Sequence, residues 1–233
     1  MWRKRQIIEL MNEPVREKIA IFLAHPKCSI QSVNGVIHAL SSHYDFKVFT
    51  KHELEEGFLD DVDLVVFPGG FGDSDSYDIL MKQHADIIRQ FVERGGKYLG
   101  ICMGAYWADR YYFDILKNIE VVQYIKQPGA AARRPHAKNM LITWQDQPMH
   151  MFFYDGCTFK GDNLNVYASY ASGHPMAIMQ GNIGLIGCHP ESQSYWYKAY
   201  SWMRGKYHQG KHHQLLLEFV HTLMKPQIFK IDE

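Results

Sequence analysis

The sequence has few cysteines, no long apolar run and no excess of charge of one sign. Its four cysteines, spread over 233 residues without a C-x-x-C pair, exclude a small disulfide-dense scaffold and favour free thiols. No stretch approaches the roughly 18 apolar residues that indicate a transmembrane helix. Lys+Arg and Asp+Glu both number 25. The whole chain therefore has no net charge that would attract nucleic acid or an anionic membrane, and we expect neither partner.

Residues 1–17 are interpreted as a short N-terminal arm, helical or frayed, ahead of a single domain over residues 18–233. The arm is basic, but Glu9, Asn12 and Glu13 interrupt any apolar stretch of the kind that a signal peptide needs. Free thiols and the lack of such a signal together predict a cytoplasmic protein.

Short apolar runs alternate with helical patterns over the first half of this domain. We expect strands at residues 18–24, 46–50, 64–67 and 97–101, and helices at residues 28–42, 77–94 and from 103 onward. Such alternation is typical of an α/β fold with a mostly parallel, doubly wound sheet. Additional strands, some of them antiparallel, are expected at residues 121–125, 140–144, 149–153, 166–170, 176–179 and 183–186. A helix at residues 215–224 follows them.

The segment Gly100-Ile101-Cys102-Met103-Gly104 lies between a predicted strand and a predicted helix. In a G-x-nucleophile-x-G arrangement, a tight turn projects the central side chain above the carboxyl end of the sheet, and crowding requires glycine on both sides. The helix N-terminus beneath the thiol favours thiolate, and the N–H of Met103 is placed to bind an oxyanion. A buried cysteine in an ordinary turn is the alternative, but the position between strand and helix favours a nucleophile.

A second motif, Cys188-His189-Pro190-Glu191, follows the strand predicted at residues 183–186. A histidine at a strand end can act as general base for a cysteine. A carboxylate two residues later can hold the imidazole by its other nitrogen, and Pro190 would stiffen that spacing. On its own, the tripeptide is explained as well by a surface turn.

Taken together, GICMG at residues 100–104, HPE at residues 189–191 and PGG at residues 68–70 resemble the class I glutamine amidotransferase superfamily. Longer segments resemble more closely the domain that precedes the catalytic part of fungal-type biotin protein ligases, which also occurs as a stand-alone bacterial protein. They read VFPGGFGDSDSYDIL, FVERGGKYLGICMGAYWAD and YASYASGHPMAIMQGNIGLIGCHPES. The resemblance covers roughly residues 18–224 and implies a flavodoxin-like fold.

This resemblance implies roles for particular residues. Cys102 corresponds to the nucleophile, His189 to its base and Glu191 to the acid that orients the base. The resemblance also implies an oxyanion hole made by the backbone N–H of Met103 with that of Gly69 or Gly70.

The resemblance further points to residues that would contact the substrate. Tyr154 begins a Tyr-Asp-Gly stretch where the family tends to carry Tyr-Asn-Gly-Gly. Glutaminases of the superfamily usually carry glutamine four residues after the nucleophile, where this chain has Tyr106 followed by Trp107. If these rings contact the substrate, they fill space in which a polar pocket would bind glutamine. Free glutamine is therefore not the expected substrate, although both rings are also typical core residues of such a helix.

Neither of two weaker patterns predicts a metal site. His208, His212 and His213 could share a helix face and bind zinc, but Gly210 interrupts them, and a solvated basic stretch is favoured. Aspartates in residues 73–78 do not complete a calcium loop, and a helix cap at residue 75 or 76 is favoured. No metal or cofactor is expected.

The leading hypothesis is a cysteine-dependent amide hydrolase, or acyl or amido transferase, with a Cys-His-Glu triad. Its substrate would be a small-molecule or peptide amide other than free glutamine. Two alternatives stay open: a non-catalytic ligand-binding or regulatory module that retains the triad residues, and a glutaminase subunit of a separate synthetase. A homo-oligomer is compatible with each of these functions.

Overall fold

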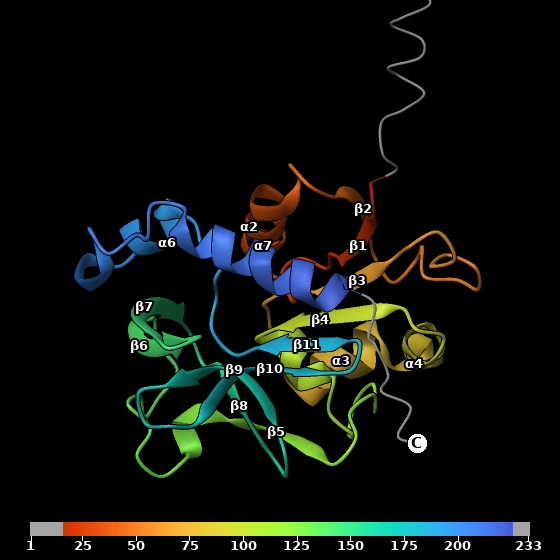
Figure 1. Cartoon of the computed structure of the whole chain (residues 1–233). Helices are drawn as coiled ribbons and strands as arrows, with labels where there is room; N and C mark the ends of the chain where they lie inside the picture. Colours follow the sequence, from red (N-terminus) through yellow and green to blue (C-terminus); the bar gives the residue numbers. More distant parts are fainter. Residues whose placement is uncertain (1–15, 226–233) are drawn as a thin grey trace, which may run out of the picture.

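A computed structural model describes residues 16–225 of the chain (Figure 1). All but the last two residues of the predicted N-terminal arm lie outside the described residues. Five strands form the parallel part of a nine-stranded sheet: β2 (Asp45–Phe49), β1 (Lys18–Phe22), β3 (Leu64–Phe67), β4 (Lys97–Ile101) and β11 (Ile183–Ile186), in that order. The alternation of strands and helices in the sequence predicts this half of the fold.

Four antiparallel strands extend the sheet beyond β11. They are β10 (Pro175–Gln180), β9 (Asn165–Tyr170), β6 (Lys138–Trp144) and β7 (Gln147–Phe153), in that order. Two further strands, β5 (Ile119–Gln123) and β8 (Cys157–Gly161), pair with each other in a separate small sheet. The predicted mostly parallel sheet with added antiparallel strands is confirmed.

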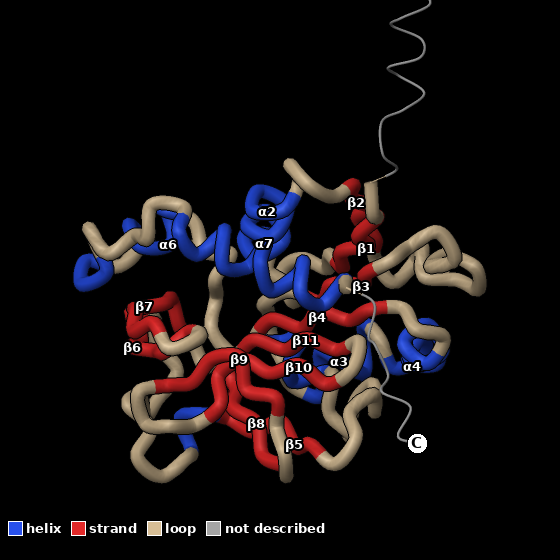
Figure 2. Tube along the Cα trace, viewed as in Figure 1, coloured by secondary structure: helices blue, strands red, loops and turns tan. Residues whose placement is uncertain are grey.

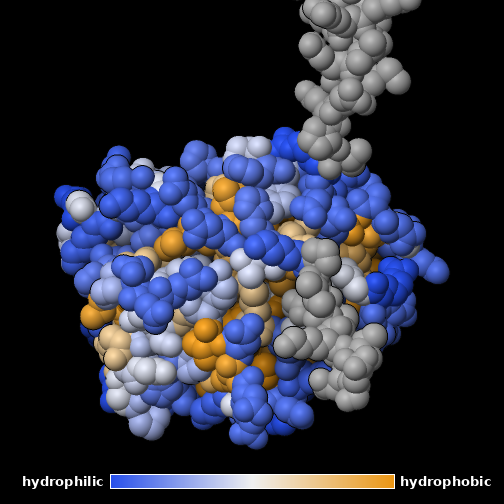
Figure 3. Space-filling model, in the orientation of Figure 1, coloured by the Kyte–Doolittle hydropathy of each residue, from blue (hydrophilic) through white to orange (hydrophobic). Residues whose placement is uncertain are grey.

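Burial differs between the two halves of the large sheet. Every residue of β3 and β11 is buried, as expected for parallel strands that are covered on both faces. The second half of β6 instead alternates between buried and exposed residues, which indicates a strand with one covered face. Figure 3 shows a largely polar surface in this view, with apolar atoms gathered over the region of β8 to β10.

Helices cover both faces of the parallel strands. A Cβ on Gly184 of β11 would lie 2.7 Å from the ring of Phe219 in α7 (Lys211–Met224), whereas a Cβ on Gly100 of β4 would collide with the Gly104 carbonyl in α5 (Met103–Trp107). Gly100 is in register with Leu185, so the two glycines point to opposite faces. Helix α2 (Ile30–Leu40) runs beside α7, as Figures 1 and 2 show.

The remaining helices are short. The helix predicted over residues 77–94 is divided into α3 (Ser74–Leu80), the 3₁₀ turn η1 (Lys82–His84) and α4 (Ala85–Glu93). Asp73 caps α3 by accepting a hydrogen bond from the Ser76 N–H at 2.7 Å, so the cap predicted at residue 75 or 76 lies two or three residues too late. The others are η2 (Tyr124–Lys126), α6 (Ser194–Lys198) and η3 (Ser201–Met203). No helix within residues 16–225 is long and apolar enough to cross a membrane.

Candidate active site

A cavity of about 1170 Å³ lies at the carboxyl ends of three neighbouring parallel strands. Its wall includes Gly69 and Gly70 after β3, Cys102 after β4 and His189 after β11. Open α/β sheets place their ligands at this edge. The fold thus brings both sequence motifs and the PGG turn to one site, although more than 80 residues separate Cys102 from His189.

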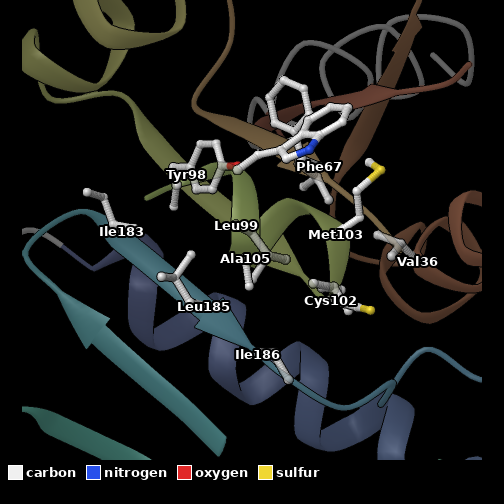
Figure 4. Close-up of a cluster of buried hydrophobic side chains, with 14 of the residues drawn as sticks. Val36, Phe67, Tyr98, Leu99, Cys102, Met103, Ala105, Ile183, Leu185 and Ile186 are labelled. Carbon is white, nitrogen blue, oxygen red and sulfur yellow. The ribbon is translucent and has the colours of Figure 1, made fainter. Parts of the chain in front are cut away.

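Cys102 occupies the tight turn between β4 and α5 in a strained conformation. Its φ is 49° and its ψ is −99°, a region that residues other than glycine rarely adopt. A Cβ on Gly104 would collide with the Phe67 carbonyl, so glycine is required there. Figure 4 shows the Cys102 sulfur directed away from the rings of Phe67 and Tyr98. The turn therefore presents the thiol to the cavity instead of to the aromatic core.

His189 and Glu191 form a buried pair beside this turn. The Nδ1 of His189 lies 2.9 Å from Oε1 of Glu191. The imidazole packs edge-on against the rings of Phe152 and Trp196, with centroid distances of 5.9 and 5.5 Å. Gly69 also lies close to the ring, since a Cβ there would be 2.7 Å from Cε1 of His189. These contacts together restrict the orientation of the ring.

Electrostatics favour the protonated form of His189. Burial lowers its pKa, but attraction to the Glu191 carboxylate and to Cys102, with the hydrogen bond to Glu191, outweighs burial and raises the pKa to about 10. This upward shift favours the imidazolium at neutral pH. A cationic imidazolium next to a cysteine favours the thiolate, which is the nucleophilic form.

The structure adds Ser32, which the sequence patterns did not identify, to the site. The Ser32 hydroxyl donates a hydrogen bond to Oε1 of Glu191 at 2.6 Å and accepts one from the Gly69 N–H at 2.9 Å. All three groups are buried. Gly35, one turn along α2, leaves room for the Glu191 carbonyl, with which a Cβ there would collide. Helix α2 thus fixes Glu191 from the face opposite α5.

The three backbone N–H groups expected to bind an oxyanion, those of Gly69, Gly70 and Met103, are not all free to do so. The N–H of Gly69 is engaged by Ser32, so it does not point freely into the cavity. The bridge between residues 27–29 and 69–71 uses the N–H groups of Ser29 and Phe71 and leaves that of Gly70 unused. Met103 is the first residue of α5, where an N–H has no intrahelical partner. Of the expected oxyanion donors, Gly70 and Met103 remain.

Two of the three expected substrate contacts line the cavity. Tyr106 lines it and donates a hydrogen bond to the Asp155 carbonyl at 3.4 Å. Tyr154 lines it with 45% of its surface exposed, and its carbonyl lies 3.8 Å from the Cys102 sulfur. Trp107 does not line it.

Trp107 is a correction to the sequence interpretation. Its side chain is fully buried and packs against the rings of Phe22, Phe67 and Phe113. On a helix, consecutive residues point about 100° apart, so Tyr106 and Trp107 face different surroundings. Trp107 belongs to the aromatic core behind the turn and does not contact the cavity.

The other three cysteines are enclosed. Cys28, Cys157 and Cys188 have no exposed surface, and burial raises the pKa of the Cys28 thiol to about 12. Burial likewise raises the pKa values of Cys157 and Cys188. Cys188 lies beside the Tyr170 hydroxyl and not in the cavity wall, although it precedes His189. Cys102 is therefore the cysteine that faces the cavity.

The C-terminal histidines form a buried cluster and not the solvated stretch expected from the sequence. His208 and His213 donate hydrogen bonds from Nε2 to the Ser192 carbonyl at 2.8 and 3.1 Å. Nδ1 of His208 accepts the N–H of His212 at 3.2 Å. Among the described residues no group of three or more His, Cys, Asp or Glu side chains could hold a metal ion. The cluster fastens the start of α7 to the residue that follows Glu191.

Comparison with known proteins shows the family that part of the chain matches and the fold of the whole. Residues 24–126 match the family described as biotin-protein ligase, N terminal. A glutamine amidotransferase from Thermotoga maritima superimposes with a TM-score of 0.66 at 13% identity, covering 91% of this chain and 100% of its own. The chain has the glutamine amidotransferase-like fold. The resemblance seen in the motifs is thus confirmed by a family match over residues 24–126 and by the fold.

Two further comparisons show that proteins with different names share this fold. A glutamine amido transferase from Methylobacillus flagellatus gives a TM-score of 0.60 at 11% identity, covering 94% of this chain and 100% of its own. An exo-β-1,4-mannosidase from an Opitutaceae bacterium gives 0.57 at 11% identity, covering 96% of this chain but 38% of its own. A search of curated proteins found no match. Because one fold occurs in proteins with such different names, the fold alone does not determine the function, which depends on the residues of the site.

Proposed function

We propose that the protein is a cysteine-dependent amide hydrolase, or acyl or amido transferase, with Cys102 as nucleophile, His189 as proton donor and acceptor, and Glu191 as the residue that orients His189. The strained backbone of Cys102 is the observation that carries this proposal. Holding a cysteine at φ 49° costs about 1–3 kcal/mol. A structural cysteine in the core gains nothing from that cost, whereas a nucleophile gains a sulfur that lines the cavity at a helix N-terminus.

The proposed reaction proceeds in two halves. The Cys102 thiolate attacks the amide carbonyl carbon, and the N–H groups of Gly70 and Met103 bind the resulting oxyanion. The tetrahedral intermediate collapses as His189 donates its proton to the leaving nitrogen, which departs as an amine or ammonia. Water, or an acceptor amine, then gives a proton to His189 and attacks the acyl-cysteine, which releases the acyl product and the thiolate.

Free glutamine is a poor fit for this cavity. A glutaminase would need a paired amide donor and acceptor at residue 106, and the phenol of Tyr106 has a single hydroxyl, which already donates to the Asp155 carbonyl. A polar substrate group left unpaired costs about 1–3 kcal/mol, or roughly a tenfold to hundredfold loss of rate. We therefore propose a different amide as the substrate, which Tyr106 and Tyr154 contact.

Iodoacetamide labelling followed by peptide mapping tests the activated cysteine. At pH 6, Cys102 should be alkylated at least about tenfold faster than the thiol of free cysteine, because a neighbouring imidazolium stabilises thiolate. His189→Gln should abolish that advantage. His150→Gln, which changes an exposed histidine on β7, is the matched control and should label as the wild type does. Labelling of Cys102 at the rate of free cysteine would contradict the proposal.

Ammonia release from glutamine tests the substrate assignment. We expect little or no turnover by the wild type, and a gain in Tyr106→Gln if residue 106 sets this preference. Robust wild-type turnover that is lost in Cys102→Ala would contradict the assignment and restore the glutaminase-subunit hypothesis.

A further inference from the structure

Asp155 is an acidic residue in the cavity wall that the proposed reaction does not use. It lies in the turn between β7 and β8 and lines the cavity together with Cys102. The carbonyl of the preceding residue, Tyr154, lies 3.8 Å from the Cys102 sulfur. Cys102 and Asp155 therefore line one cavity, and Asp155 directly follows the residue whose carbonyl lies next to the Cys102 sulfur.

The backbone at Asp155 suits an acidic or amide side chain. Its φ is 52°, in the left-handed region where Asp and Asn are enriched among residues with a side chain. Nε2 of Gln123 lies 3.1 and 3.3 Å from the two carboxylate oxygens, and the Asp155 carbonyl accepts the hydroxyl of Tyr106. These contacts hold the carboxylate at a fixed place in the wall.

The carboxylate has no cationic partner within ion-pair distance. Among the described residues no Lys, Arg or His nitrogen forms an ion pair with it. Lys126, one turn beyond Gln123, is exposed and acts on it only through a longer-range attraction. Burial raises the pKa of Asp155, and this effect outweighs the hydrogen bond from Gln123. A half-buried carboxylate of this kind is stabilised by a cation that enters the cavity.

Aromatic rings surround the same cavity. Those in its wall include Tyr106, whose hydroxyl contacts the Asp155 carbonyl, and Tyr154, which precedes Asp155 in the chain. Ring faces attract ammonium groups, so a carboxylate among such rings has the chemistry of an organic-cation site. Lys126, His25 and His189 also line the wall and oppose the entry of an additional cation.

We propose that the cavity accepts an amide substrate, other than glutamine, that carries a protonated amine, and that this ammonium group binds Asp155 while the scissile carbonyl lies at Cys102. This inference rests on the proposed function in one respect, namely that the substrate group that reacts with Cys102 is an amide. The ammonium site itself rests on the position and contacts of Asp155.

The test measures how fast charged methanethiosulfonates modify Cys102. Each reagent forms a mixed disulfide with the Cys102 thiolate and releases methanesulfinate, so no substrate has to be known. The cationic 2-aminoethyl, the anionic 2-sulfonatoethyl and the neutral methyl reagents are compared by peptide mapping, with free cysteine as the reference thiol. In the wild type the ratio of cationic to anionic rates should exceed that of free cysteine by about tenfold or more.

Asp155→Asn removes the charge, keeps the side-chain shape and tolerates the left-handed backbone, so this ratio should fall by about tenfold. Asp73→Asn is the matched control. It removes an exposed carboxylate from the same wall and retains a capping residue for α3, so the ratio should change by less than about threefold. An unchanged ratio in Asp155→Asn, or an equal fall in both variants, overturns the ammonium site. If the neutral reagent modifies Cys102 no faster than it modifies free cysteine, that result counts against the proposed function. The ratio of cationic to anionic rates does not depend on this outcome and tests the ammonium site alone.

Discussion

Removal of the Ser32 hydroxyl tests whether α2 positions the candidate nucleophile's partners. Ser32→Ala deletes the 2.6 Å hydrogen bond to Glu191 and leaves the Gly69 N–H without its acceptor. A hydrogen bond to a charged group contributes about 1.5–3 kcal/mol, and a buried unpaired donor costs about 1–3 kcal/mol. Because the two losses share one atom and are not additive, we expect a net loss of about 2–4 kcal/mol. For a domain of this size, that lowers Tm by roughly 5–15 °C.

The same substitution should slow the reaction of Cys102. Without Ser32 the Glu191 carboxylate can rotate, so His189 is held less firmly, and a misplacement of about 1 Å costs on the order of a hundredfold in rate. The assay combines calorimetric Tm with the rate of iodoacetamide labelling at pH 6. Ser29→Ala is the matched control, since it also removes a hydroxyl from the start of α2.

The control separates stability from positioning. Loss of the Ser29 cap costs about 1 kcal/mol and should leave the labelling of Cys102 unchanged, because within residues 16–225 the Ser29 hydroxyl accepts the Ser32 N–H and does not contact Glu191. Ser32→Ala should affect both measurements. A Ser32→Ala protein with wild-type Tm and wild-type labelling would refute the positioning role.

Two further predictions concern the imidazoles. Gly69→Ala places a methyl group 2.7 Å from Cε1 of His189, so the labelling of Cys102 should fall about tenfold or more with circular dichroism unchanged, and wild-type labelling would contradict this. Burial lowers the pKa values of His208 and His212 to about 4 and about 3, from 6.5 in the unfolded chain. The unfolded chain therefore binds protons first as the pH falls, and the free energy of unfolding should decrease from about pH 6.5 to 4, by up to about 1.4 kcal/mol per pH unit for each proton. Urea titrations should show this slope, and His208→Gln should flatten it; a constant free energy over that range would contradict the assignment.

The sequence predicted the secondary structure best where the local pattern of apolar residues and turns alone determines it. The expected bounds of β3, β4 and β11 match the structure, because each is a short buried run that ends at a turn. β8, with the sequence CTFKG, was not predicted, because it contains only two apolar residues and its pairing with β5 decides its structure. The helix predicted over residues 77–94 is broken near Met81, which its apolar spacing does not reveal.

Within the candidate site, too, the sequence predicts the residues that lie in local motifs and misses those brought in by tertiary contacts. Cys102 and His189 are predictable because each lies in a short motif at the end of a strand. Ser32 lies 159 residues from Glu191 in the sequence, and a serine near the start of a helix carries no signal of such a contact. The sequence left Trp107 between the substrate pocket and the core, and it placed His212 in solvent, for a related reason. Aromatic and imidazole rings occur both inside and outside proteins, and tertiary packing decides between the two.

The order of strands in the sheet has a consequence for how the protein folds. β4 and β11 are hydrogen-bonded neighbours, yet residues 102–182 lie between them, including the antiparallel part of the sheet. Closing a flexible loop of that length costs about 4 kcal/mol, whereas the hairpin of β6 and β7 closes locally and forms within microseconds. We therefore expect the antiparallel hairpins to form first, with Cys102 and His189 brought together late in folding, once that intervening chain has become compact.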